Sequence, residues 1–150
     1  MMNIRKAELH DLTSVVTLFE QYRHFYQCEN NTERATDFIQ SRMEQEESVI
    51  FIAEVTSEGD TKIVGFVQLY PLFSSTSMKK MWLLNDLFVN GNHRKQGIAA
   101  QLIASAKQLA ENTAARGLML ETSPSNKAAQ ALYEKIGFKQ SNSFYYELDV

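Results

Sequence analysis

The chain has 150 residues, with 15 basic and 18 acidic side chains and a formal net charge of −3. This length predicts a single domain over residues 1–150, because domains commonly contain ~100–200 residues. Hydrophobic residues make up 44% and charged residues 22%, a balance that excludes a disordered polymer and a fibrous repeat. The negative net charge argues against broad nucleic-acid binding.

The sequence carries no targeting or metal-binding signal. Residues 1–6 lack an apolar leader, and no stretch approaches the ~18 consecutive apolar residues of a membrane helix. The single cysteine, Cys28, excludes an internal disulfide, and no Cys/His cluster has zinc-ligand spacing. We therefore expect a cytoplasmic protein with no metal and no nucleic-acid or membrane partner.

The first third of the chain predicts a strand and two helices. The strand is expected at residues 3–7, and Asp11 suits the N-cap of the helix that follows. Apolar residues then recur at three- and four-residue spacings, the period of a helix: they are Leu12, Val15, Val16, Phe19, Tyr22 and Tyr26. A second helix is expected from Thr32 to the acidic run at residues 44–47.

The middle of the chain predicts strands. Residues 48–55 and 62–70 read as an antiparallel hairpin, ended by Pro71, and residues 81–89 form a third long strand. A polar loop is expected at residues 74–80.

The last third predicts two helices and two strands. One helix starts near Gly97, a short strand covers residues 117–122, and a second helix runs from Asn126 to Gly137. A closing strand is expected at residues 144–148. This order of elements is that of a mixed α/β (α+β) domain.

The segment from the strand ending at Val89 to the next helix carries the chemical signal. The first N–H groups of a helix lack intrahelical partners, and its dipole favours anions. Gly97 lets a ligand approach the backbone, while Arg94 and Lys95 add positive charge. This pattern predicts a phosphate or pyrophosphate cradle, with a solvated basic turn as the alternative. It is neither a Walker A loop nor a three-glycine dinucleotide fingerprint.

Two motifs resemble those of the GNAT family of N-acetyltransferases. Residues 94–99 (RKQGIA) match the signature [Q/R]-x-x-G-x-[G/A], and residues 126–138 resemble the hallmark N-x-x-A-x-x-L-Y-x-x-x-G-F. The resemblance covers nearly the whole chain. It implies a mostly antiparallel central sheet, splayed in the middle and flanked by about four helices.

The resemblance also implies acetyl-CoA as co-substrate, without a metal, between strand 81–89 and strand 117–122. It assigns the pantetheine arm and the pyrophosphate to Leu87, Phe88, Val89, Arg94, Lys95, Gln96, Gly97, Ile98, Ala99, Asn126 and Tyr133. Asn126 would bind the pantetheine or only cap its helix. Tyr133, two turns later, would act as the general acid for the departing thiolate, with a half-buried aromatic as the alternative.

The general base and the acceptor site are less clearly marked. Relatives of the diamine acetyltransferase type carry an acid where this chain has Asn85, and period-two alternation puts Asn85 and Asp86 on opposite faces. We nominate Asp86 as the base, with proton loss to bulk water as the alternative.

Residues 68–75 and 82–89 resemble polyamine and diamine acetyltransferases and a histone-and-polyamine branch of the family. Tyr70, Phe73, Trp82 and Asn85 are therefore candidate acceptor-binding residues, although the three aromatic ones also suit the core. The acidic residues Glu29, Glu33 and Asp37 would steer a polycation or form a solvated helix face.

The sequence thus predicts an acetyl-CoA-dependent N-acetyltransferase that acts on a primary amine of a polyamine or amino-acid-like molecule, by direct attack in a ternary complex. The alternatives are a protein or peptide acetyltransferase and a non-catalytic acyl-CoA-binding module. Many relatives dimerise through their C-terminal strands, so we expect a homodimer in which residues 144–146 take part.

Overall fold

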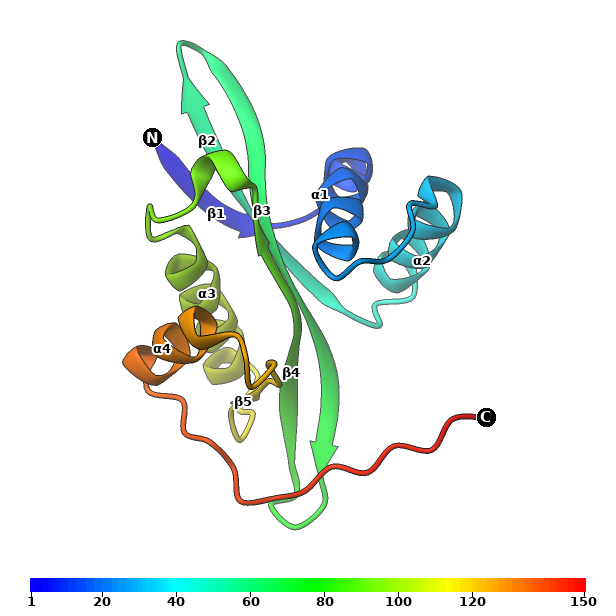
Figure 1. Ribbon diagram of the computed structural model, residues 1–150, viewed down its shortest axis with the longest axis vertical. Helices are drawn as coiled ribbons and strands as arrows, with labels where there is room; N and C mark the ends of the chain where they lie inside the picture. The colour runs from blue at the N-terminus through cyan, green and yellow to red at the C-terminus, as the bar shows by residue number, and fades with distance from the viewer.

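Five strands form one sheet in the order β1-β2-β3-β4-β5 in the computed structural model, which describes all 150 residues (Figure 1). The strands are β1 (Met2–Lys6), β2 (Val49–Ser57), β3 (Asp60–Ser74), β4 (Lys79–Val89) and β5 (Leu118–Met119). Strands β1 to β4 pair antiparallel, and β5 lies parallel to β4. The predicted mixed α/β class with a mostly antiparallel sheet is confirmed.

Four α-helices cover the two faces of this sheet. Helices α1 (Leu12–Phe25) and α2 (Thr32–Glu44) lie on one side, and α3 (Ile98–Asn112) and α4 (Lys127–Ile136) on the other (Figure 1). Short 3₁₀ turns, η1 (Leu9–Asp11) and η2 (Gly91–His93), precede α1 and α3. Each face has its own apolar core, one beneath α1 and α2 and one beneath α3. None of the helices is both long and apolar enough to cross a membrane.

A bulge in β4 reverses the side-chain alternation of that strand. Gln68 pairs with Asp86 and Leu69 with Leu84, so Asn85 has no partner in β3. As a result, Trp82 and Leu84 belong to the core beneath α3, whereas Phe88 belongs to the core beneath α1 and α2.

Strands β4 and β5 separate soon after they meet. Only two positions pair, Trp82 with Leu118 and Leu83 with Met119, and the chain after β5 then leaves the sheet. The predicted splay is therefore confirmed. The strand predicted over residues 117–122 shortens to two residues because its second half has no neighbour.

Two predictions about strands are wrong: where β3 ends, and whether residues 144–148 form a strand. Strand β3 continues past Pro71 to Ser74, and β2 no longer pairs with β3 beyond Leu69, so Pro71 occupies an edge position that tolerates the missing N–H. The predicted strand at residues 144–148 does not form. The segment after α4 crosses the end of the sheet and runs away from the body (Figure 1). Its alternating apolar pattern is present, but no strand of this chain lies beside it.

An ion cluster ties β1 to the start of α1. The Arg5 guanidinium donates two hydrogen bonds of 2.8 Å to the two carboxylate oxygens of Asp11, and its Nε donates to Glu54 at 2.9 Å. Asp11 stands at the predicted N-cap position, but its side chain accepts from the N–H of Glu8 in the preceding turn and not from α1. Hydrogen bonding to Arg5 lowers the pKa of the buried Asp11 carboxyl to about 2.

This cluster predicts an acid-sensitive contribution to stability. Because the pKa of Asp11 falls from 3.8 to about 2 on folding, its stabilising effect is present above about pH 4 and disappears as the pH falls toward 2. We expect Asp11→Asn to lower the free energy of unfolding by about 2 kcal/mol at neutral pH. Urea denaturation of both proteins at several pH values measures this difference. A difference as large at pH 2 as at neutral pH would contradict the prediction.

Candidate active site

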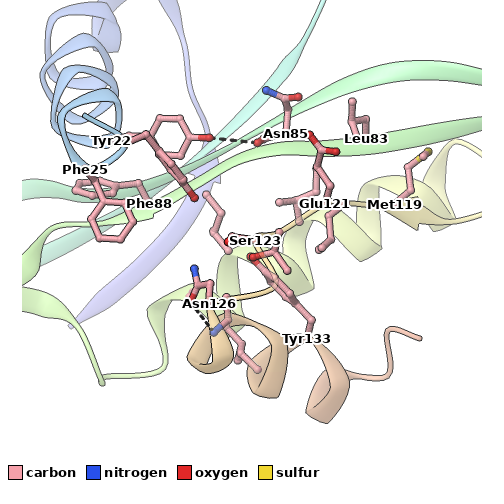
Figure 2. Close-up of a pocket in the computed structure, with 18 of the residues that line it drawn as sticks. Tyr22, Phe25, Leu83, Asn85, Phe88, Met119, Glu121, Ser123, Asn126 and Tyr133 are labelled. Carbon is pink, nitrogen blue, oxygen red and sulfur yellow. Dashed lines mark hydrogen bonds between the residues drawn. The ribbon is translucent and has the colours of Figure 1, made fainter. Parts of the chain in front are cut away.

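A cavity of about 800 Å³ opens where β4 and β5 separate (Figure 2). Its walls come from the C-terminal end of α1, the splayed part of β4, the segment after β5 and the inner face of α4. Of the 22 lining residues, 16 are hydrophobic, so the site suits a largely apolar ligand with a few polar contacts.

The loop before α3 presents an unbroken run of free main-chain donors. None of the N–H groups from Lys95 to Ala100 donates to another backbone group of the chain, and no side chain caps α3. Lys95 and Gly97 both adopt left-handed conformations, with φ of 61° and 77°. Such a turn of free N–H groups at a helix N-terminus is an anion-binding concavity. The predicted cradle therefore has the donors that a pyrophosphate requires.

Arg94 connects this loop to α1. Its Nε donates to the carbonyl oxygen of Val89 at 3.1 Å. Its guanidinium lies over the rings of Phe25 and Phe88, at 5.6 Å and 5.5 Å. These contacts fix the Arg94 side chain at the mouth of the cavity.

The other residues predicted to bind the cofactor divide into three groups. Leu87, Phe88, Val89, Ala99, Asn126 and Tyr133 line the cavity. Lys95, Gln96 and Gly97 lie exposed in the loop before α3. The side chain of Ile98 is buried in the core, which leaves only its main chain for a ligand. Beyond Leu83 the edge of β4 that faces the cavity has no partner strand, so an extended ligand can pair with it.

Asn126 and Tyr133 occupy the same side of α4. The Asn126 side chain accepts a 3.2 Å hydrogen bond from the N–H of Ala129 and so caps the helix. Tyr133 reaches into the cavity (Figure 2), and its ring packs edge-on against Phe138. Burial raises the pKa of the Tyr133 phenol. The hydroxyl is therefore protonated at neutral pH.

Asp86, the residue nominated as the base, does not itself line the cavity. Its side chain is only 5% exposed, and its carboxylate accepts hydrogen bonds from Gln68 at 2.8 Å and Asn85 at 3.1 Å. Burial raises the pKa of Asp86, although these hydrogen bonds oppose the shift. The predicted separation of Asn85 and Asp86 onto opposite faces is wrong, because the bulge brings their side chains together.

Asn85 is the one predicted acceptor-site residue on the main cavity. The residue is exposed, and its carbonyl oxygen accepts a 3.4 Å hydrogen bond from the hydroxyl of Tyr22 (Figure 2).

The three aromatic acceptor candidates lie elsewhere. Trp82 is a core residue whose indole N–H donates to Thr113 at 2.9 Å. Tyr70 is half-buried, lines neither large cavity, and has a pKa raised by burial to about 12. Phe73 is exposed and lines a second cavity of about 900 Å³, beside β5 and residues 138–145.

Among the lining residues that the sequence analysis did not predict for the site are one acidic residue and three aromatic residues at the end of α1. Glu121 is the only acidic residue that lines the cavity, and Figure 2 shows its side chain within it, directed toward β4. A charged residue at the end of an apolar strand is the sequence signal that could have identified it. Tyr22 and Phe25 lie in the last turn of α1, and Tyr26 is its C-cap residue. The helical period marks Tyr22 and Tyr26 only as apolar positions.

Comparison with known proteins identifies the family. The sequence model described as "Acetyltransferase (GNAT) family" matches residues 15–138. The uncharacterized N-acetyltransferase YhfO of Bacillus subtilis (strain 168) is 42% identical over 150 residues, which cover 99% of this chain and 98% of that protein.

Two solved structures have the same fold. The crystal structure of a probable acetyltransferase superposes with a TM-score of 0.91, at 38% identity, over 99% of this chain and 97% of the other. A structure from Clostridium acetobutylicum titled a predicted acetyltransferase with acetyl-CoA has a TM-score of 0.79 at 19% identity, over 99% and 96% of the two chains. The chain therefore belongs to the acetyltransferase (GNAT) family and is an N-acetyltransferase, a type of acyltransferase.

Proposed function

We propose that the protein transfers an acetyl group from acetyl-CoA to the primary amine of a small molecule, by direct attack in a ternary complex. One observation carries this proposal: a single cavity joins the mouth of the anion cradle at Arg94 to an acid candidate, Tyr133, and a base candidate, Glu121. The two reactants and both proton-transfer groups then share one largely apolar volume. A protein lysine or N-terminal amine is the alternative acceptor.

The residues present fit acetyl-CoA. The free N–H groups from Lys95 to Ala100 suit the pyrophosphate, with the charge of Arg94 beside them. The unpaired edge of β4 between Asn85 and Val89 suits the amide-containing pantetheine arm. The bound co-substrate supplies the acetyl thioester.

Tyr133 is proposed as the general acid. Burial raises its pKa, so the phenol keeps its proton until a stronger base forms beside it. The Tyr133 hydroxyl makes no hydrogen bond within the chain and lies in the cavity. It is therefore free to donate its proton to the sulfur of the departing thiolate.

Glu121 replaces Asp86 as the proposed base. An ammonium group must lose a proton before its nitrogen can attack a carbonyl carbon. Glu121 is the only carboxylate on the cavity wall, whereas the carboxylate of Asp86 is buried and does not line the cavity. Glu121 accepts the proton directly or through one water molecule.

Calorimetric titration with acetyl-CoA tests the cofactor site. We expect saturable one-to-one binding that Gly97→Glu abolishes, because the new carboxylate adds bulk and negative charge beside the free N–H groups. Two control variants separate the effect of a carboxylate in the cradle from the effects of losing Gly97 and of adding charge nearby. Gly97→Ala has the same positive φ but a small side chain, and Gly91→Glu adds the same charge to the loop outside the cradle. Both should still bind.

Absence of binding by the wild type would overturn the cofactor assignment, and retained affinity in Gly97→Glu would place the pyrophosphate elsewhere. Release of free thiol that depends on added amine excludes a non-catalytic module.

Turnover in two variants tests the proton-transfer groups. We expect Tyr133→Phe and Glu121→Gln each to lower kcat by ~10²–10⁴-fold with little change in acetyl-CoA affinity. The defect of Glu121→Gln should shrink at alkaline pH, where the amine is already neutral. Tyr70→Phe and Glu134→Gln make the same chemical changes outside the main cavity and should keep wild-type turnover. Normal turnover in either test variant would remove that residue from the mechanism.

We also propose that the protein is a homodimer held through its C-terminal segment, residues 144–150. Phe144, Tyr146 and Leu148 alternate along this segment and are 86–93% exposed, with no strand beside them. An unpaired apolar segment with strand-like alternation can pair with another chain. Pairing between two copies would bury these side chains.

Sedimentation velocity tests the dimer. We expect a dimer for the wild type and a monomer for Tyr146→Asp, because a carboxylate would have to enter the apolar interface. Met78→Asp, at the exposed turn between β3 and β4, adds the same charge outside the segment and should remain dimeric. A monomeric wild type at micromolar concentration would refute the proposal.

A further inference from the structure

The C-terminal end of α1 and its cap residue present three aromatic side chains to the cavity. Tyr22, Phe25 and Tyr26 form this aromatic wall, which none of the proposed catalytic or cofactor-binding roles uses. Tyr26 packs edge-on against both neighbours, with ring centroids 5.0 Å from Tyr22 and 5.2 Å from Phe25. Figure 2 shows Tyr22 and Phe25 across the cavity from α4. The wall therefore faces the site of acetyl transfer from the side opposite Tyr133.

The wall is held in place before any ligand binds. Tyr22 packs against Phe66 and Phe88 of the sheet, at 6.0 Å and 6.4 Å between ring centroids. Phe25 lies under the guanidinium of Arg94, itself bonded to a main-chain carbonyl. Fixed rings lose little conformational entropy when a ligand packs on them.

Two of the three side chains of this wall are more than half exposed. Phe25 and Tyr26 are each 55% exposed, whereas Phe19, about two turns earlier on α1, is 8% exposed. Covering large exposed aromatic side chains in a concave site with an apolar group is favourable, because it removes apolar surface from water. The wall thus calls for a ligand with an apolar or aromatic body.

The charges of the cavity limit how many ammonium groups it can hold. Only Arg94 and Glu121 are charged among the lining residues. A polyamine has ammonium groups spaced along its length, and each one needs a carboxylate or carbonyl partner after it leaves water. Glu121 can serve one ammonium group, and Arg94 repels a second.

The other acidic residues do not supply the missing partners. Asp86 is buried, and neither it nor Glu29, Glu33 or Asp37 lines the cavity. The aromatic wall is also poorly placed to bind a second cation, because the face of Phe25 already carries Arg94.

We infer that the acceptor is a monoamine with an aromatic or bulky apolar body, whose ammonium group lies at Glu121 and whose body packs on the aromatic wall. This inference rests on the proposed acetyl transfer and narrows its substrate. Arylalkylamines such as 2-phenylethylamine belong to this class, and spermidine does not.

A comparison of three amines tests this class. We expect kcat/KM for 2-phenylethylamine to exceed that for butylamine and for spermidine by ~10–100-fold, the range for filling or emptying part of an apolar pocket. Butylamine has the same reacting group without the ring. Tyr26→Ala should reduce the preference for 2-phenylethylamine over butylamine about tenfold, with acetyl-CoA affinity unchanged. Tyr26→Phe keeps the ring and should keep the preference.

The outcomes separate this inference from the proposed function. Spermidine used as well as 2-phenylethylamine, or a preference unaffected by Tyr26→Ala, would overturn the inference and leave acetyl transfer standing. If no amine is acetylated although acetyl-CoA binds, the proposed function fails. Calorimetry of 2-phenylethylamine with the acetyl-CoA-saturated protein then tests the wall alone. Binding weakened by Tyr26→Ala supports the aromatic wall, and equal binding by the two proteins overturns it.

Discussion

The separation of β4 from β5 after two paired positions is the constraint on which the site depends. A sheet that stayed paired would satisfy its own main-chain groups and leave no room between these strands. The separation exposes an unpaired strand edge, and it lets the chain after β5 turn outward and carry Glu121 and α4 along the opposite side. The cavity, its free main-chain groups and the position of Tyr133 all follow from the loss of pairing.

The bulge at Asn85 is the second determinant, because it decides which side chains of β4 meet a ligand. Without it, Asp86 would continue the alternation of the strand and lie on the other face. With it, the carboxylate enters the core beneath α1, where Gln68 and Asn85 donate hydrogen bonds that offset part of the cost of burial. The polar pair of Gln68 and Asp86 therefore stabilises the strand pairing beside the bulge.

The parts of the site that the sequence predicts are those formed by residues close together in the chain. The cradle depends on Gly97 and on the start of α3, and the position of Tyr133 depends on the length of α4 from its cap at Asn126. Both are local. The bulge depends on the register between β3 and β4, so the strict alternation assumed for β4 misplaced Asp86. The closing strand depends on a neighbour that this chain does not supply.

One apolar stripe of α1 covers both the core and the cavity, so helical periodicity alone does not distinguish the aromatic wall from core residues. Val15, Phe19, Tyr22 and Tyr26 follow one period, which predicts a single buried face. Val15 and Phe19 meet the sheet and are buried, but α1 extends past the part of β4 that it covers. The same stripe then continues over the cavity, where Tyr26 is 55% exposed. Periodicity specifies which residues share a face, and only the tertiary structure decides whether that face meets a core or a ligand.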